Sequence, residues 1–129
     1  MRKAILMMLL AVASSSALAE WLEIDSNKIS TVYVDITTIR KAGNRVSIWS
    51  LHGYKTVRKV MGRTYRSIKM QSEYDCQEEK MRMLYLSEHS ENNGGGIIIH
   101  SESTPDSNWR PVPTDSVSKT ILEIACLKQ

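Results

Sequence analysis

The sequence contains no apolar run long enough to cross a membrane, and it carries little net charge. Its longest apolar stretch runs from Ala4 to Ala13, well short of the roughly 20 residues that a membrane-spanning helix needs. The formal charge of the whole chain is +3. Removal of Arg2 and Lys3 with an N-terminal segment would leave +1, a balance that predicts no class of partner. These absences argue against a membrane anchor and leave the partner open.

Cysteine is scarce, because only Cys76 and Cys126 occur in the chain. They are too far apart for a C-x-x-C redox pair and too few for a four-ligand zinc site. In an oxidising compartment they can pair in only one way within a monomer, and the alternatives are an intermolecular bond or two free thiols. An internal bridge would close a loop of about 50 residues and stabilise the fold by about 4 kcal/mol on the chain-entropy model.

Recognisable catalytic motifs are also missing. Serine is abundant, but no G-x-S-x-G elbow or S-x-x-K motif occurs. Glu78 and Glu79 are adjacent, so on a strand they would point to opposite faces and could not act as a carboxylate pair. The glycines at 94–96 lack the phosphate-loop pattern and are more typical of a hairpin loop. We therefore expect a binding protein rather than an enzyme, and no cofactor.

The histidines of the chain, His52, His89 and His100, lie on different predicted strands without metal-ligand spacing. His89 and His100 flank the glycine loop and could approach each other across it to hold a metal or haem. We expect surface or half-buried histidines instead, and no metal site. We also expect three methionines of the predicted strands to fill the core rather than to bind copper or a peptide; they are Met70, Met81 and Met83.

An export signal is present at the N-terminus. Arg2 and Lys3 precede the apolar stretch, and Ala17-Leu18-Ala19 follows it as an A-x-A cleavage motif. We expect residues 1–19 to be removed and residues 20–129 to form a single domain in the periplasm or at the outer cell surface. Because no cysteine follows the cleavage motif directly, we do not expect a lipoprotein. Export also argues against a nucleic acid as the partner.

Alternating apolar and polar residues predict a β-rich domain. The expected strands cover residues 21–25, 31–35, 45–57, 65–70, 80–86 and 97–99. Residues 35–39 look too polar for a buried strand, so a short helical turn is expected there. In the strand at 45–57, Val46 and Ile48 face one side, and Trp49 and Leu51 the other. Apolar groups on both faces hint at a self-association surface.

Turn residues and one helical pattern complete this prediction. Turns or loops are expected at 43–44, 61–62, 92–96 and 104–108. A C-terminal helix follows, with Thr114 or Asp115 as its N-cap. Its apolar residues share one stripe that must pack on the rest of the domain; they are Val117, Ile121, Ile124 and Ala125. Cys126 lies at the end of the helix, so a bond to Cys76 would tie the helix to the strands.

The charge is least even between residues 55 and 69, where the chain has six cations and no acid. These cations are Lys55, Arg58, Lys59, Arg63, Arg66 and Lys69. Such a run can be a solvated face or can protect an edge strand from pairing with another sheet. It can equally attract an acidic partner. The sequence leaves both interpretations open.

Several segments together resemble the surface-adhesin protein E family of Gram-negative bacteria. They are Thr31 to Asp35 with Thr38-Ile39-Arg40, Tyr74-Asp75-Cys76, Gly94-Gly95-Gly96, Trp109 to Pro113, and Ile124-Ala125-Cys126. The resemblance covers nearly all of residues 20–129 and depends on the order of the segments and the cysteine positions. It implies an α+β fold: an antiparallel sheet of about five to six strands, similar to a PAS domain, with a C-terminal helix disulfide-bonded to it. It also implies a tendency to form homodimers.

The same resemblance implies a surface adhesin that binds the host glycoproteins vitronectin and laminin. Family adhesins bind partly through a basic segment just before the first cysteine, and the matching positions here are Arg63, Arg66 and Lys69. Alternation on a regular strand would put Arg66 on the opposite face from the other two, so we expect Arg63 with Lys69 to supply most of the attraction. The alternative is a periplasmic structural or accessory protein that binds an envelope component or itself and has no host ligand.

Overall fold

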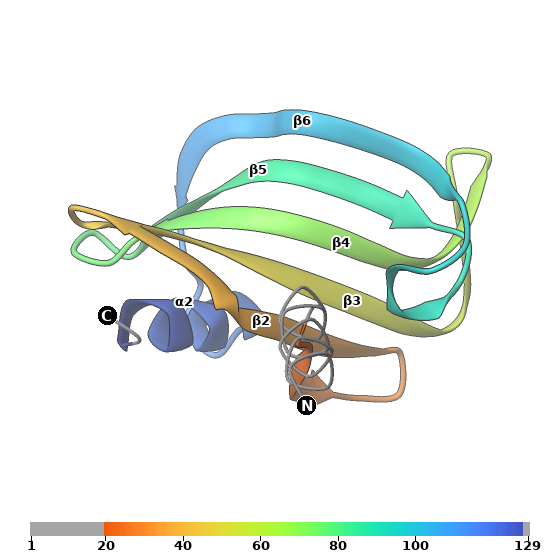
Figure 1. The fold of residues 1–129 in the computed structure, drawn as a ribbon, viewed down its shortest axis with the longest axis horizontal. Coiled ribbons are helices and arrows are strands. Elements are labelled where there is room, and N and C mark those ends of the chain that lie inside the picture. The colour runs from red at the N-terminus through yellow and green to blue at the C-terminus, as the bar shows by residue number, and fades with distance from the viewer. Residues whose placement is uncertain (1–19, 128–129) are drawn as a thin grey trace, which may run out of the picture.

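The computed structural model describes residues 20–127, except for the side chains of residues 105–107. The predicted signal segment, residues 1–19, lies outside the described residues. The elements are β1 (Leu22–Ser26), β2 (Ser30–Ala42), β3 (Arg45–Val60), β4 (Arg63–Asp75), β5 (Lys80–His89), the 3-10 turn η1 (Asn92–Gly94), β6 (Ile98–Pro111) and α2 (Val117–Leu127). Each strand pairs antiparallel with its sequence neighbours, so the six-stranded sheet has the order β1-β2-β3-β4-β5-β6 (Figure 1). The predicted antiparallel sheet with a C-terminal helix is confirmed.

Two of the predicted turns connect long neighbouring strands through two residues each. Gly43 has a φ of 64° between β2 and β3, and Gly62 has a φ of 77° between β3 and β4. Only glycine adopts such left-handed angles without a steric cost, which is why the strands reverse at these points. The turns expected at 43–44 and 61–62 are therefore confirmed.

The helical turn predicted at residues 35–39 is wrong, because β2 continues through this segment as an irregular strand. The pairing register with β3 shifts between Asp35 and Arg40. Within the irregularity, the Thr37 backbone N–H donates to the Asp35 carboxylate at 3.0 Å, and the Trp49 N–H donates to Thr38 Oγ1 at 3.0 Å. Polar side chains thus take over backbone hydrogen bonds that the bulge removes from the ladder.

The loop predicted at 104–108 is also wrong, because β6 runs through it to Pro111. The pairing of β5 with β6 survives with several register shifts, and Met83 lies opposite Asp106. β6 is an edge strand, so one of its sides has no ladder to interrupt. A proline and local bulges are tolerated there, as they would not be in a central strand.

The C-terminal helix starts at Val117, and its N-cap is Ser116. The Ser116 Oγ accepts a hydrogen bond from the Lys119 N–H at 3.1 Å. The predicted N-cap at Thr114 or Asp115 is therefore wrong, and Asp115 instead has a φ of 58° in the preceding turn. Among residues 20–127, no helix has the length and apolar character to span a membrane.

The core lies between α2 and one face of the sheet, which we call the helix face. It is built from one side of α2, which includes the predicted apolar stripe, from inward-facing residues of β2 to β4, and from one residue after β6. The buried members are Val32, Val34, Val46, Ile48, Tyr74, Val112, Ile121, Leu122 and Ala125. Figure 1 shows α2 lying along the curved sheet near β2. The predicted disulfide between Cys76 and Cys126 is confirmed and joins the end of α2 to the chain just after β4.

Candidate ligand-binding face

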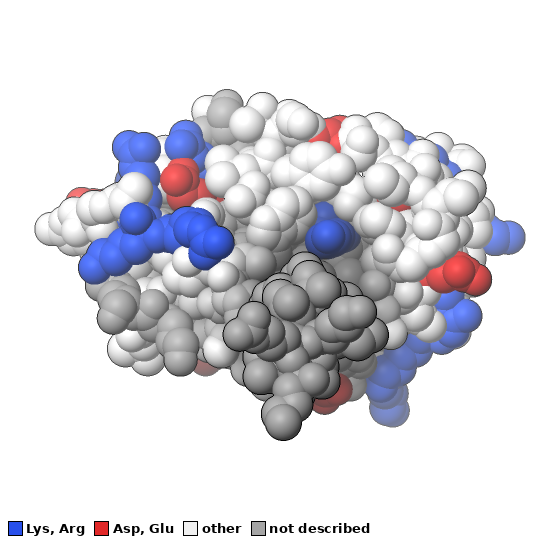
Figure 2. Space-filling view, in the orientation of Figure 1, with Lys and Arg blue, Asp and Glu red and all other residues white. Residues whose placement is uncertain are grey.

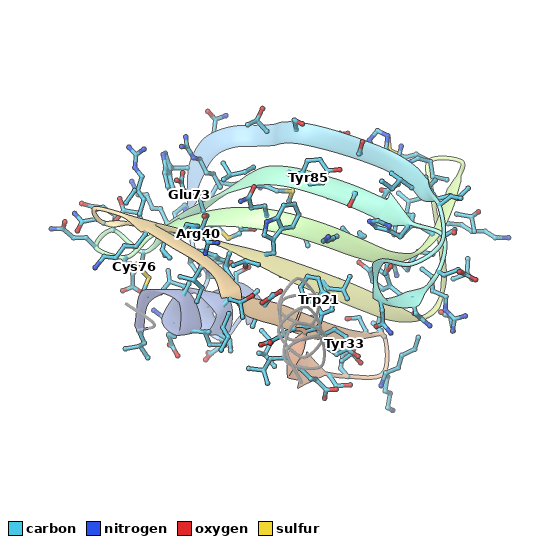
Figure 3. All side chains as sticks on the ribbon, viewed as in Figure 1. Trp21, Tyr33, Arg40, Glu73, Cys76 and Tyr85 are labelled. Atoms are coloured by element: carbon cyan, nitrogen blue, oxygen red, sulfur yellow. A yellow bond between two sulfur atoms is a disulfide. The ribbon has the colours of Figure 1, made fainter. Side chains whose placement is uncertain are left out.

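The sheet face opposite the core carries a row of paired residues that crosses the strands. Asp35 of β2 lies opposite Trp49 of β3, Trp49 lies opposite Gln71 of β4, and Gln71 lies opposite Tyr85 of β5. Their strand neighbours, such as Val34, point into the core, so alternation directs this row away from α2. We call this surface the aromatic face. In Figure 3, Tyr85 lies over the sheet and Trp21 at its lower edge.

Aromatic rings and one cation contact each other at the centre of the aromatic face. The rings of Trp49 and Tyr85 meet edge to face, with centroids 5.6 Å apart and an interplanar angle of 62°. The Lys69 Nζ lies 5.2 Å from the centroid of the Trp49 ring. These distances are those of favourable aromatic and cation–π contacts. All three side chains remain partly exposed, so the cluster is available to a ligand.

A hollow of about 300 Å³ opens beside this cluster, and we call it the Trp hollow. It is lined by Trp21, Asp35, Thr38, Trp49 and Lys69. The buried Asp35 carboxylate accepts hydrogen bonds from the backbone N–H groups of Glu20 and Thr37, and Thr38 Oγ1 donates to the Asp35 carbonyl oxygen. The floor of the hollow is therefore fixed by internal hydrogen bonds, and Lys69 is the cation that lines it.

A second hollow of about 220 Å³ borders an earlier part of β2, and we call it the Arg hollow. Its lining residues are Thr31, Tyr33, Gly53, Tyr54, Lys55, Arg66, Asn92 and Asn93. Arg66 Nη2 donates to the Lys55 carbonyl oxygen at 3.2 Å. Its Nε is buried and has no hydrogen-bond partner within residues 20–127. A buried donor without a partner carries a desolvation cost that a bound acceptor would relieve.

The glycine loop predicted between β5 and β6 covers the other end of the aromatic face. Ser67 Oγ donates to the Glu91 carbonyl oxygen at 2.6 Å, and the Gly94 N–H donates to Ser67 Oγ at 3.0 Å. Leu51 is fully buried, and Gly94 packs over it. The second apolar face predicted for β3 is therefore only partly covered, because the glycine loop packs on Leu51 and leaves Trp49 partly exposed.

Arg63 is engaged by an acidic partner within the domain. Its Nε donates to Glu88 Oε1 at 2.7 Å and its Nη2 to Glu88 Oε2 at 3.2 Å, while the Glu88 side chain is 6% exposed. This two-point hydrogen bond raises the pKa of the Arg63 guanidinium. Neutralising a buried carboxylate is a structural task, so Arg63 is less available to an external ligand than Arg66 or Lys69.

The structure does not bring Arg63, Arg66 and Lys69 together into one patch. Arg63 pairs with Glu88, Arg66 lines the Arg hollow and Lys69 lines the Trp hollow. The pairing of β3 with β4 is interrupted between Gly53 and Arg58, and such an irregularity re-aims the side chains around it. A simple alternation of faces along β4 therefore could not predict their positions.

The histidines that flank the glycine loop lie apart. His89 is buried and its Nε2 is 2.7 Å from Ser87 Oγ; desolvation, followed by the charge of Lys69, lowers the pKa of His89. His100 lies 2.7 Å from Glu102 and pairs in register with Glu88, one residue before His89 on β5. Alternation thus points the two imidazoles to opposite faces. No cluster of three or more His, Cys, Asp or Glu suited to a metal occurs in residues 20–127.

Further cations of the aromatic side are also engaged within the domain. Two guanidinium groups contact the Trp109 ring, with Arg82 at 4.6 Å and Arg45 at 5.7 Å from its centroid. Arg82 in turn pairs with Glu73 at 2.7 Å. Figure 2 shows Lys and Arg side chains gathered towards the left end and the lower right of this view. Arg82 differs from Lys69 and Arg66 because its guanidinium is already paired with a carboxylate of the domain.

The sequence pointed to the cations of this face but not to its aromatic row. Trp21, Trp49 and Tyr85 come from segments far apart in the chain, and only the strand register aligns them. A signal was present, since Trp49 stands on the side of its strand away from Val46 and Ile48. That signal predicted self-association and not a ligand site. The sequence does not show that the glycine loop covers Leu51 and leaves only Trp49 available on this side of the strand.

Comparison with known proteins identifies relatives of this fold. A sequence model of the family described as surface-adhesin protein E matches residues 21–127. The structure of Haemophilus influenzae protein E, in its selenomethionine form, is similar with a TM-score of 0.59 and 15% identity, over 81% of this chain and 85% of that one. Crystal form II of the same protein gives a TM-score of 0.59 and 13% identity, over 86% and 97%. No curated protein sequence matches the chain.

Proposed function

Because the chain belongs to the surface-adhesin protein E family, we propose that it is an exported binding module that takes an acidic partner on its aromatic face. In this proposal residues 1–19 direct export and are removed, and residues 20–129 act outside the cytoplasm without a lipid anchor. The partner is a host matrix glycoprotein such as vitronectin or laminin. The protein binds its partner and does not convert it chemically.

The observation that supports this proposal is the position of Lys69 and Arg66, each of which lines a hollow that borders β2. Lys69 rests on Trp49 and forms no ion pair with the described acidic side chains of residues 20–104 and 108–127. Arg66 presents a buried Nε that lacks a partner within the same range. Both are held by aromatic or backbone contacts and not by acids of the domain. They can therefore pair with carboxylate or sulfate groups of a ligand.

Of the predicted binding residues, Arg63 takes a different part in this proposal. Its guanidinium neutralises the Glu88 carboxylate, so a substitution there would disturb folding and binding together. We therefore assign ligand attraction to Lys69 and Arg66 and leave Arg63 unchanged in the test. Self-association of the domain stays a prediction from the family resemblance.

Reversing the two charges should weaken capture of vitronectin or laminin about tenfold at low ionic strength, because complementary charge speeds association. The variant is Arg66→Glu with Lys69→Glu, and surface plasmon resonance at 20 to 300 mM salt (about the range over which screening changes strongly) measures the effect. Wild-type binding should fall steeply across this range, and binding by the variant should be weak throughout.

Lys59→Glu is the matched control, because Lys59 is exposed in the same basic segment and lines neither hollow. It should bind like the wild type. Equal capture by the double variant and the wild type, at matched urea midpoints, would remove the two hollows from consideration. Capture by neither protein would favour the periplasmic accessory role. Two measurements would then decide: antibody labelling of the protein on intact cells, and its presence in the fraction released by osmotic shock.

A further inference from the structure

The Arg hollow differs from the Trp hollow in the charges of its lining. Two cations, Lys55 and Arg66, line the Arg hollow, and none of the described residues around it is acidic. In the Trp hollow, the cation Lys69 is accompanied by the Asp35 carboxylate. Opposite charges within one site offset each other, whereas cations without an acid favour a bound anion. The Arg hollow is therefore the better place for a fully charged group of a ligand.

Arg66 is held at the wall of this hollow by one hydrogen bond and keeps a buried donor unpaired. A guanidinium carries five N–H groups, and the Lys55 carbonyl oxygen accepts one of them from Nη2 at 3.2 Å. The Nε is buried and has no hydrogen-bond partner in the described part of the chain. A buried charged donor without an acceptor is unfavourable. An anionic oxygen bound beside Nε would therefore stabilise the site.

Further donor groups border the hollow from three parts of the fold. They belong to β2, to the part of β3 that follows Gly53, and to the glycine loop; they are Thr31, Tyr33, Tyr54, Lys55, Asn92 and Asn93. Hydroxyl, ammonium and amide groups can all donate to an anionic oxygen. Figure 3 shows Tyr33 on the β2 side. A group with oxygens in several directions can use donors from all three parts.

Hydrogen bonds fix the glycine loop and thereby the amide side chains at the hollow. The Ser67 hydroxyl of β4 is bonded twice by the loop, once as donor and once as acceptor. Within the loop, the Gly95 N–H donates to the Asn92 carbonyl oxygen at 3.0 Å. Asn93 has a φ of 59°, a left-handed angle that asparagine accepts more readily than most residues. The two amides thus start from an ordered backbone, which lowers the entropic cost of binding.

The absence of a side chain at Gly53 leaves this hollow open. A Cβ placed there would lie 3.9 Å from the Thr31 carbonyl oxygen and 3.9 Å from a ring carbon of Tyr33. Both of these residues line the hollow, so a larger side chain at position 53 would occupy it. The volume of about 220 Å³ holds several waters, each of which takes about 30 Å³ in the liquid. A small oxyanion can therefore replace them.

We infer that the Arg hollow binds a sulfate or phosphate monoester, with Arg66 Nε as one of its donors. Such a group presents three charged oxygens around its central atom, whereas a carboxylate presents only two. Donors from three parts of the fold and two cations without an acid match the monoester better. The inference rests on the proposed function and names the group of the acidic partner that this hollow takes.

Nuclear magnetic resonance titration of the processed, isotope-labelled protein with small anions at constant ionic strength tests the inference. The probes are sodium sulfate, sodium phosphate and sodium acetate. With sulfate or phosphate we expect saturable shifts of the Arg66 Nε–H signal and of the Asn92 and Asn93 side-chain amides. About tenfold more acetate should be needed for half-saturation, because one charged hydrogen bond is lost. Binding of sulfate alone or of phosphate alone supports the inference and assigns the ester.

Two variants separate a specific site from general attraction of anions. Arg66→Lys keeps the positive charge but removes Nε, and should weaken binding of the monoester-like anion about tenfold. Gly53→Val keeps every cation but fills the hollow, and should abolish saturable binding. Should it not fold, Gly53→Ala narrows the hollow by one methyl group and should weaken binding severalfold. Lys59→Gln is the matched control, because Lys59 is exposed and lines neither hollow, and it should bind like the wild type.

Shifts that grow without saturation overturn the inference, as do equal half-saturation by acetate and unchanged binding by the Arg66 or Gly53 variant. Glycoprotein capture that depends on Lys69 and Arg66, without saturable binding of sulfate or phosphate, overturns the inference and leaves the proposed function standing. Binding of either anion in the Arg hollow without glycoprotein capture supports the site and contradicts the proposed partner.

Discussion

The Cys126→Ser variant is expected to unfold with a free energy about 4 kcal/mol lower than that of the wild type. The bridge joins residues 50 apart in sequence, and cross-linking a loop of this length removes about that much entropy from the unfolded chain. The helix α2 has 11 residues, too few to be stable without its contacts to the sheet. Equilibrium urea unfolding of the exported protein measures the change.

Cys76→Ser with Cys126→Ser is the matched control, because it removes the bridge without leaving a thiol that can pair between molecules. Both variants should lose the same stability. The rate of amide hydrogen exchange should increase more in α2 than in β3 and β4. An unfolding free energy within about 0.5 kcal/mol of the wild type, the usual range for surface substitutions, would show that the bridge does not hold the helix in place.

A second large effect is expected at Asp35, which is 3% exposed. The Glu20 nitrogen lies 3.1 Å from its Oδ2. If cleavage occurs after Ala19, as proposed, this nitrogen becomes the α-ammonium group of the mature chain and forms an ion pair with the buried carboxylate. Asp35→Asn should then lower the free energy of unfolding of the processed protein by about 3 kcal/mol, since breaking a buried pair leaves one charge uncompensated.

A chain with one glycine added before Glu20 tests whether the ammonium group is responsible. It keeps an amide nitrogen at Glu20 but moves the positive charge away, so Asp35→Asn should cost clearly less in this background. Glu23→Gln, an exposed carboxylate of β1, should change stability by less than about 0.5 kcal/mol in either chain. An equal cost of Asp35→Asn in both backgrounds would contradict the ion pair.

The sequence predicted most strands and turns because their signals are local. Alternation marks one buried face, and Gly43 and Gly62 reverse the chain where positive φ angles are needed. The failures occur where side chains replace the usual backbone pattern. The Asp35 carboxylate and the Thr38 hydroxyl accept backbone hydrogen bonds at the bulge inside β2. Pro105 is tolerated because β6 is an edge strand. Neither effect can be derived from periodicity alone.

The candidate site was less accessible to prediction than the fold. The sequence identified a basic segment, but the ion pair of Arg63 with Glu88 joins β4 to a residue 25 positions away. The row of Trp21, Trp49 and Tyr85 requires the register of several strand pairs at once. A shift of one residue in any pair would send its side chains to the other face. Long-range register was therefore the missing information.

The most direct test of the account is a map of backbone amide shifts in the processed, isotope-labelled protein as ligand is added. The titrant is a soluble laminin or vitronectin fragment. We predict that the largest shifts occur at amides of the aromatic face, around Trp49, Lys69 and Tyr85, with those of α2 unchanged. Shifts confined to α2 and the helix face, with the Trp49 and Lys69 amides unmoved at saturation, would contradict the claim that the aromatic face is the binding surface.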